Sequence, residues 1–265
     1  MIRNMETNTK TLILANLFGL AVALVVNYLA VSLPLFGEST AQLSDQYPNL
    51  FVPAGLTFSI WGVIYTWLLV FAGCQAAALF SPNMMQRVEP VVQKTGWLFL
   101  SICAYNALWL VTWHLKLTGL SVVVMVSLVV KLLQLNVKAG VGRTASDSLE
   151  KWIAHAPFGI YQGWITIALI ANATAFLVAV HWTGFGIAEN VWTMVMIGAG
   201  ALIACLMVWR QNNIFHGFAV AWALLGIYLK RSEAADAPEI VTTAVVCMGV
   251  VLALSLWRSR NWLAY

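Results

Sequence analysis

Long stretches of apolar residues, separated by short polar segments, dominate this chain. Each stretch spans 17 to 27 residues without the strict alternation of apolar and polar positions that is typical of a half-buried strand. A helix needs ~20 mostly apolar residues to cross a bilayer. We therefore predict eight membrane-spanning helices, at about Thr11–Leu33, Ala54–Phe80, Trp97–Leu115, Thr118–Val137, Phe158–Val180, Val191–Trp209, Asn213–Leu229 and Ile240–Trp257.

The composition supports a membrane protein. Apolar residues make up 61% of the 265 residues, charged residues only 9%, and the mean hydropathy is +0.83. Soluble domains carry about 25% charged residues, so this chain has too few to cover a surface that faces water. A transmembrane barrel would show ~10-residue stretches of alternating polarity, which are absent here. We expect an all-α integral membrane protein.

The distribution of Lys and Arg predicts the orientation of the chain. If the N-terminus lies in the cytoplasm, the cytoplasmic segments hold ten of these residues and the outer segments hold three. This bias indicates a multi-pass protein with both termini in the cytoplasm. The basic residues do not cluster on one face, so no nucleic-acid partner is expected.

Acidic residues lie outside the apolar stretches. All ten fall in predicted loops or at helix ends, so no carboxylate is expected at the bilayer midplane. This pattern argues against ion-coupled transport and against carboxylate acid–base chemistry at membrane depth. We recognise no nucleophile–His–acid set, cofactor motif or metal cluster, and expect no enzyme, no cofactor and no metal site. Pro157 is expected to open the fifth helix, and His155, just before it, to be solvated.

Three helices carry stripes of aromatic and amide residues. Residues three or four positions apart share one face of a helix. A single stripe of this kind more often packs in a core than forms a site, but three stripes in one bundle favour a pocket. The stripes are Phe58, Trp61 and Tyr65 in the second helix; Asn106, Trp109 and Trp113 in the third; and Tyr161, Trp164, Ala168 and Asn172 in the fifth.

The same residues carry a resemblance to a known family. The run from Pro48 to Pro53, followed by Trp61 and Tyr65, is similar to the entry into the second helix of the tryptophan-rich sensory proteins, the TspO or translocator protein (peripheral benzodiazepine receptor) family. The third-helix stripe and the fifth-helix stripe resemble that family's motifs in the same order. The resemblance covers about residues 11–180.

The chain departs from the family pattern in several places. Val52 precedes Pro53 where the family has adjacent prolines, the tryptophan expected near Leu50 is absent, and Phe58 is one position off the usual aromatic residue. The family's bundle has five helices. The resemblance therefore implies a distant, enlarged member, with a five-helix bundle in residues 1–180 and a three-helix extension in residues 181–265.

The resemblance also implies a site and a function. A bacterial member would lie in the inner (plasma) membrane and act as a receptor or sensor. It would bind a flat hydrophobic ligand, a tetrapyrrole or a sterol, in an aromatic cavity covered by the loop 34–52. The expected ligand-binding residues are Pro53, Phe58, Trp61, Tyr65, Asn106, Trp109, Trp113, Tyr161, Trp164 and Asn172.

Other functions and partners remain open at this point. The three added helices favour, as the alternative, a transporter or permease for a hydrophobic small molecule. A membrane enzyme acting on a porphyrin or an isoprenoid is the weaker third hypothesis. Besides the ligand, the expected partner is membrane lipid. Ala15-x-x-x-Gly19 fits either a homodimer contact or packing within the bundle.

Overall fold

The computed structural model describes residues 2–31, 37–143 and 148–263. Every regular element in these ranges is helical, which confirms the all-α fold. Eight of the helices have 17 residues or more and match the eight predicted apolar stretches. They are α1 (Ile2–Val31), α3 (Ile60–Ala78), α5 (Leu98–His114), α6 (Thr118–Ala139), α8 (Ala156–Ala179), α9 (Glu189–Gln211), α10 (Ile214–Ala234) and α11 (Pro238–Leu263).

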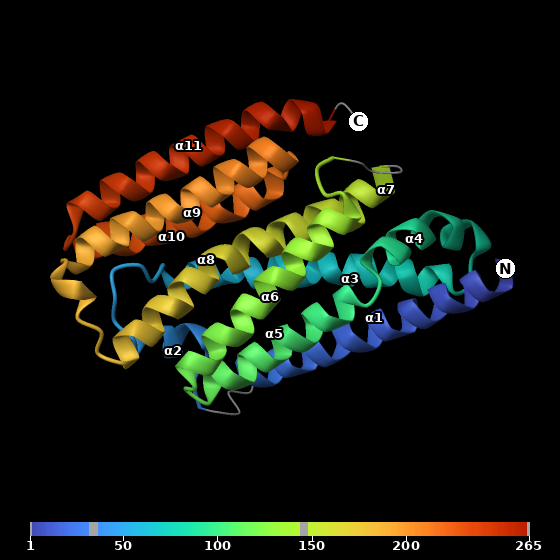
Figure 1. The fold of residues 1–265 in the computed structure, drawn as a ribbon, viewed down its shortest axis with the longest axis horizontal. Coiled ribbons are helices and arrows are strands. Elements are labelled where there is room, and N and C mark those ends of the chain that lie inside the picture. Colours follow the sequence, from blue (N-terminus) through green and yellow to red (C-terminus); the bar gives the residue numbers. More distant parts are fainter. Residues whose placement is uncertain (1, 32–36, 144–147, 264–265) are drawn as a thin grey trace.

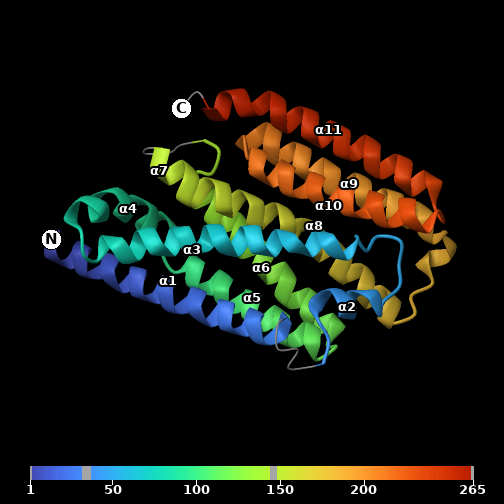
Figure 2. The same cartoon turned by 180° about the vertical axis from the view of Figure 1, so that it is seen from behind.

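The helices lie lengthwise in one bundle. α1 begins at the same end of the bundle as α11 ends (Figure 1). α1 packs against α5, α5 against α6, and α6 against α8, while α9, α10 and α11 pack against one another. α8 also packs extensively against α10 and so joins the last three helices to the first five (Figures 1 and 2). A division into separate domains at residue 180 stays a prediction.

Length and composition identify the candidate membrane spans. Six helical segments qualify in the described part of the chain: Asn8–Ala30, Gly55–Ala78, Thr118–Ala139, Ser148–Ala179, Glu189–Gln211 and Pro238–Arg260. α4 (Pro82–Thr95) and α5, bent by 61° at the break between them, form a seventh if they count as one span. α10, the shortest predicted span, is not in this set. About half of its residues are buried against protein, so it faces little lipid.

The polar segment between the second and third predicted spans is itself a helix, α4. Ser81 begins α4 by accepting a hydrogen bond from the Met84 N–H at 3.3 Å, and Pro82 occupies the first turn, where proline is tolerated. Val88 and Val92 then pack against Leu12 and Ile13 of α1. The apolar face of this amphipathic helix explains why it forms despite Pro90.

The start of α8 bears on two predictions. α8 begins at Ala156 with Pro157 in its first turn, close to the predicted start, but α7 (Ser148–Glu150) and the π-turn η2 (Lys151–His155) lead into it without a break. A π-turn leaves room for a proline that cannot donate the usual helical hydrogen bond. The prediction that His155 is solvated is wrong: it is 2% exposed, and its Nε2 lies 3.2 Å from the Ala139 carbonyl oxygen.

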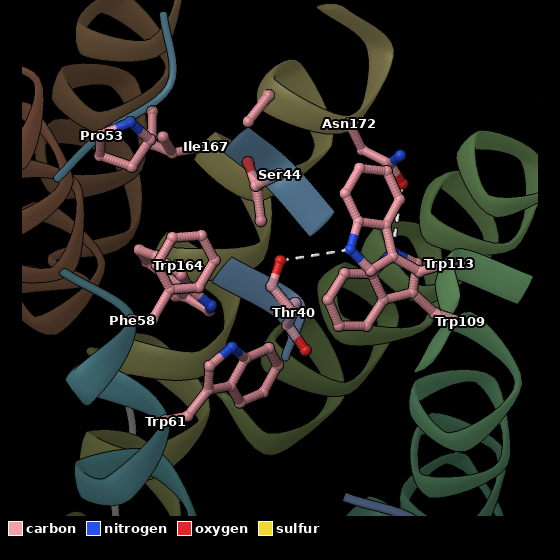
Figure 3. A pocket seen from close by; sticks show the side chains of 12 residues that line it. Thr40, Ser44, Pro53, Phe58, Trp61, Trp109, Trp113, Trp164, Ile167 and Asn172 are labelled. Atoms are coloured by element: carbon pink, nitrogen blue, oxygen red, sulfur yellow. Dashed lines mark hydrogen bonds between the residues drawn. The ribbon is translucent and has the colours of Figure 1, made fainter. Parts of the chain in front are cut away.

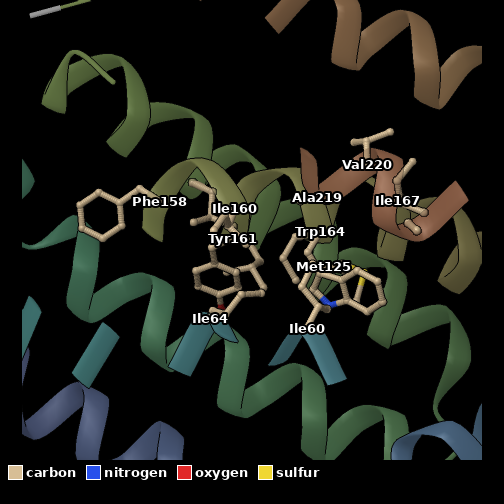
Figure 4. Close-up of a cluster of buried hydrophobic side chains, with 14 of the residues drawn as sticks. Ile60, Ile64, Met125, Phe158, Ile160, Tyr161, Trp164, Ile167, Ala219 and Val220 are labelled. Atoms are coloured by element: carbon tan, nitrogen blue, oxygen red, sulfur yellow. The ribbon is translucent and has the colours of Figure 1, made fainter. Parts of the chain in front are cut away.

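The core around α8 depends on small residues. Bulky apolar side chains of α3, α6, α8 and α10 fill the centre of the bundle, among them Ile64, Met125 and Trp164 (Figure 4). A Cβ atom on Gly163 would lie 2.5 Å from the carbonyl oxygen of His216 in α10. Glycine there lets the two backbones approach closely, as is common between membrane helices.

Candidate functional site

One pocket collects most of the residues that the aromatic stripes predicted. It lies between the short helix α2 (Thr40–Asp45), the 3-10 helix η1 (Gly55–Ser59), α3, α5 and α8 (Figure 3). Seven of the ten predicted site residues line it: Pro53, Phe58, Trp61, Trp109, Trp113, Trp164 and Asn172. The sequence did not single out the other lining residues as ligand contacts: Thr40, Ser44, Ile167, Ala168 and Ala171.

The indole rings of the pocket form a column. Trp61 lies 6.1 Å from Trp109 between ring centroids, with an angle of 24° between the planes, and Trp109 lies 6.5 Å from Trp113 at 20°. Trp164 meets Trp61 edge-on at 6.3 Å. Stacked and edge-on arrangements are the favoured geometries of aromatic pairs. The column thus presents near-parallel aromatic faces from two helices to one pocket.

Hydrogen bonds fix two of these rings. The Trp109 Nε1–H donates to Asn172 Oδ1 at 3.1 Å, and Asn172 Nδ2 donates to Ser121 Oγ at 2.9 Å. The Trp113 Nε1–H points to the carbonyl oxygen of Thr40 in α2 at 3.4 Å. The amide of Asn172 is therefore satisfied at membrane depth, as the cost of burying a polar group requires. Its visible role is to hold the Trp109 ring.

Three predicted residues lie beside the pocket rather than in its lining. Tyr65 stacks on Trp61 at 5.3 Å and donates its hydroxyl hydrogen to Asn106 Oδ1 at 3.1 Å. Tyr161 meets Trp61 edge-on at 5.8 Å. Tyr65 and Tyr161 thus pack against Trp61, and Asn106 holds the Tyr65 hydroxyl. A role for them in contact with a ligand stays a prediction.

A short helix covers the pocket. α2 lies within the loop that was expected to act as a lid, of which residues 37–52 are described. Its start is fixed by a capping box: Ser39 Oγ accepts from the Gln42 N–H at 3.3 Å, and Gln42 Oε1 accepts from the Ser39 N–H at 2.7 Å. This arrangement directs Thr40 and Ser44 toward the pocket.

The pocket is nearly closed in this structure. Its free volume is about 40 Å³, enough for a few water molecules, whereas sites for drug-sized ligands measure about 300–1,000 Å³. Two of its polar atoms, Trp164 Nε1 and Thr40 Oγ1, are buried without a hydrogen-bond partner in the described part of the chain. The pocket thus holds unused hydrogen-bonding capacity but would have to widen to accept a large ligand.

The last three helices contact the segment between α2 and α3, which borders the pocket, a relationship that the sequence did not predict. The Ala54 N–H donates to the Gly226 carbonyl oxygen of α10 at 3.0 Å, and the Trp222 Nε1–H donates to the Thr57 carbonyl oxygen at 2.9 Å. Glu189 at the start of α9 accepts the Leu50 N–H at 2.8 Å. No local pattern signals contacts between residues so distant in the chain.

Comparisons with known proteins give the family. No curated protein and no solved structure matches the chain. Within the described ranges, no group of three or more His, Cys, Asp or Glu side chains could hold a metal ion. A family model described as TSPO-like protein matches residues 12–257, a range that includes nearly all of the last three helices as well as the aromatic pocket. The chain therefore belongs to the TSPO-like protein family.

Proposed function

We propose that this protein is a membrane receptor or sensor that binds a flat hydrophobic ligand, a tetrapyrrole or a sterol-like molecule, beneath α2. The single observation that carries the proposal is the set of near-parallel indole faces of Trp61, Trp109 and Trp113, all of which line one pocket. The family to which the chain belongs consists generally of non-enzymatic receptors and sensors, and we propose no enzymatic activity.

The chemistry of the pocket favours a flat ligand with a polar edge. Indole faces stack well on conjugated or fused rings, and each aromatic pair contributes ~0.5–1.5 kcal/mol beyond the burial of its area. Among the lining residues, Trp164 Nε1 can donate a hydrogen bond, and Thr40 Oγ1 can donate or accept one. A ligand that fills the pocket would satisfy both atoms.

Binding requires a change in the lid. About 40 Å³ is too little for a tetrapyrrole, so α2 and the rings beneath it have to separate. The occupied and empty proteins would then differ in the position of α2. Ligand binding shifts a protein between states for which the ligand has different affinities, and such a shift is what a sensor needs.

Quenching of intrinsic tryptophan fluorescence tests this proposal. The purified protein is titrated with protoporphyrin IX and, separately, with a competing sterol. We expect saturable quenching that Trp61→Leu weakens by about tenfold, because one stacking face of the column is lost. Trp257→Leu is the matched control, since Trp257 stacks on Trp209 in the last helices, away from the pocket. Equal affinity in all three proteins would exclude the pocket.

A transporter for a hydrophobic solute is the second candidate. Buried polar atoms without a partner in the described residues continue outside the pocket: Asn106 Nδ2, Gln162 Oε1 and both ring nitrogens of His216. Such groups in a membrane bundle often mark a solute path. Counterflow of labelled protoporphyrin in proteoliposomes distinguishes the two functions. Flux that Gln162→Leu abolishes supports transport, and flux no greater than that of empty vesicles excludes it.

A further inference from the structure

A second hollow lies on the other side of α8. It is a groove of about 540 Å³ between α8 and α9. The aromatic pocket is lined by Ala168, Ala171 and Asn172, whereas the groove is lined by Leu169, Ile170 and Ala173. α8 therefore forms a wall between two separate spaces. The volume of the groove falls within the range of small-molecule sites.

The groove is about as long as a lipid chain in one leaflet. Along α8 it extends from Leu169 to Val178, which is about 14 Å at 1.5 Å per residue, or about half of a ~30 Å hydrocarbon core. α8 and α9 are in close contact farther down, where a Cβ on Gly200 would lie 2.7 Å from Ile167 Cδ1. They diverge toward the linker that joins them (Figure 1). The result is an apolar slot that runs along the helices.

The wide end of the groove has the features of a membrane interface. Trp182 and Trp192 both line it, with ring centroids 5.4 Å apart, and the Trp192 Nε1–H donates to the Gly184 carbonyl oxygen at 3.0 Å. Tryptophan is enriched at the level of lipid headgroups. A lipid chain in the slot would therefore place its headgroup at this end.

A charged recess adjoins the groove at the same end. The recess measures about 450 Å³ and shares Pro48, Asn49 and Glu189 with the groove. It is lined by two cationic side chains and three carboxylates. Lys230 pairs with Asp45 at 2.6 Å, and Arg231 Nη1 pairs with Asp236 Oδ2 at 2.9 Å. Side chains of both signs thus stand next to the mouth of an apolar slot.

Arg231 lines this recess and does not use all of its hydrogen-bond donors. Its side chain is 9% exposed, and its Nε is buried with no hydrogen-bond partner in the described ranges. Guanidinium groups bind phosphate well because their N–H groups match its oxygens. Glu189 supplies a carboxylate in the same recess, with Oε1 accepting the Leu50 N–H. A phosphate and an ammonium group would each find an opposite charge.

We infer that the groove and the recess together bind a zwitterionic phospholipid of the surrounding bilayer. One acyl chain lies between α8 and α9, the phosphate lies toward Arg231, and the headgroup ammonium lies toward Glu189. A phospholipid with a net negative charge lacks the ammonium and meets three carboxylates. Its affinity should be lower by about fivefold, which corresponds to the free energy of one exposed ion pair.

Native mass spectrometry of the full-length protein tests the acyl groove. The protein in mild detergent is mixed with phosphatidylethanolamine and phosphatidylglycerol of the same chain length in equal amounts. We expect preferential retention of phosphatidylethanolamine, and its loss in Ala173→Trp and in Met196→Trp, which fill the groove from α8 and from α9. Val246→Trp, at an exposed position of α11, is the matched control. Retention in both groove variants equal to that of the control would overturn the site.

A second variant tests the headgroup assignment. Glu189→Gln removes the negative charge but keeps an oxygen that can accept the Leu50 N–H. We expect total lipid retention to stay the same while the preference for phosphatidylethanolamine falls by about fivefold. An unchanged preference would overturn the role of Glu189. Protoporphyrin binding, measured on the same variants, keeps this result separate from the function of the aromatic pocket.

Discussion

The Lys230 ammonium nitrogen of α10 lies 2.6 Å from Asp45 Oδ1 of α2, so the C-terminal helices contact the lid of the aromatic pocket directly. Both side chains are partly exposed, at 29% and 59%. Exposed ion pairs contribute only ~0–1 kcal/mol and are screened by salt. This contact is strong enough to bias the position of α2 and weak enough to break during ligand entry.

Lys230→Met should make the lid easier to open. We expect the association rate of protoporphyrin IX, measured by stopped-flow tryptophan quenching, to rise by about two- to fivefold. This change corresponds to the free energy of one exposed ion pair. Raising the salt concentration should produce the same increase in the parent protein and little in the variant. An association rate that responds to neither change would mean that the Lys230–Asp45 pair does not restrain the lid.

Gly226 is required where α10 meets η1. A Cβ at this position would lie 1.9 Å from Thr57 Oγ1 and 2.9 Å from Pro53 Cβ, so Gly226→Ala must push the pocket wall away. Overpacking of this kind costs ~1–3 kcal/mol. We expect a lower apparent Tm in detergent, measured by tryptophan fluorescence, and weaker ligand binding.

Gly249→Ala serves as the control for Gly226→Ala. A Cβ on Gly249 in α11 would meet nothing within 4 Å, so alanine fits there and favours the helix. The apparent Tm should stay the same or rise. Equal losses of Tm in the two variants would show that the Gly226 contact has no special importance.

The sequence predicted the aromatic column because helical periodicity is a local property. Trp61 and Tyr65, and Trp109 and Trp113, are four residues apart, so any helix places each pair on one face. The apolar runs also located the helices that carry them. Six of the seven predicted residues that line the pocket belong to these stripes, whereas Pro53 lies outside the helices and was predicted from the resemblance.

The remaining parts of the site depend on contacts between distant segments. The Ala54–Gly226 hydrogen bond joins residues that no periodic pattern relates, and Ser121, the partner of Asn172, lies in an ordinary apolar helix. The helical lid did have a local signal, since Ser39 and Gln42 have capping-box spacing. Burial of His155 followed from the π-turn, which the sequence around Pro157 did not reveal.

Asn172 should be more important for stability than Ser121. Asn172→Leu removes the acceptor of the buried Trp109 Nε1–H and the partner of Ser121, and a buried polar group without a partner costs ~1–3 kcal/mol. Ser121→Ala leaves the Trp109–Asn172 bond in place and should cost less. The apparent Tm of the two variants and the emission maximum of the tryptophans report the difference. A larger loss of Tm in Ser121→Ala would contradict this assignment.

Trp164→Phe separates the needs of folding from those of binding. The Trp164 Nε1–H is buried and has no partner in the described residues, while its ring packs edge-on against Phe58 and Trp61. Phenylalanine keeps much of the ring packing and removes a donor whose burial costs ~1–3 kcal/mol, so the apparent Tm should not fall. If this N–H bonds to the polar edge of the ligand, affinity for protoporphyrin IX should drop by about five- to tenfold.

Trp257→Phe, in the exposed pair with Trp209, should change neither the apparent Tm nor the affinity. A stable Trp164→Phe protein with unchanged affinity would mean that the ligand does not use this donor, whereas a large loss of Tm would mean that the ring itself is essential to the pocket wall.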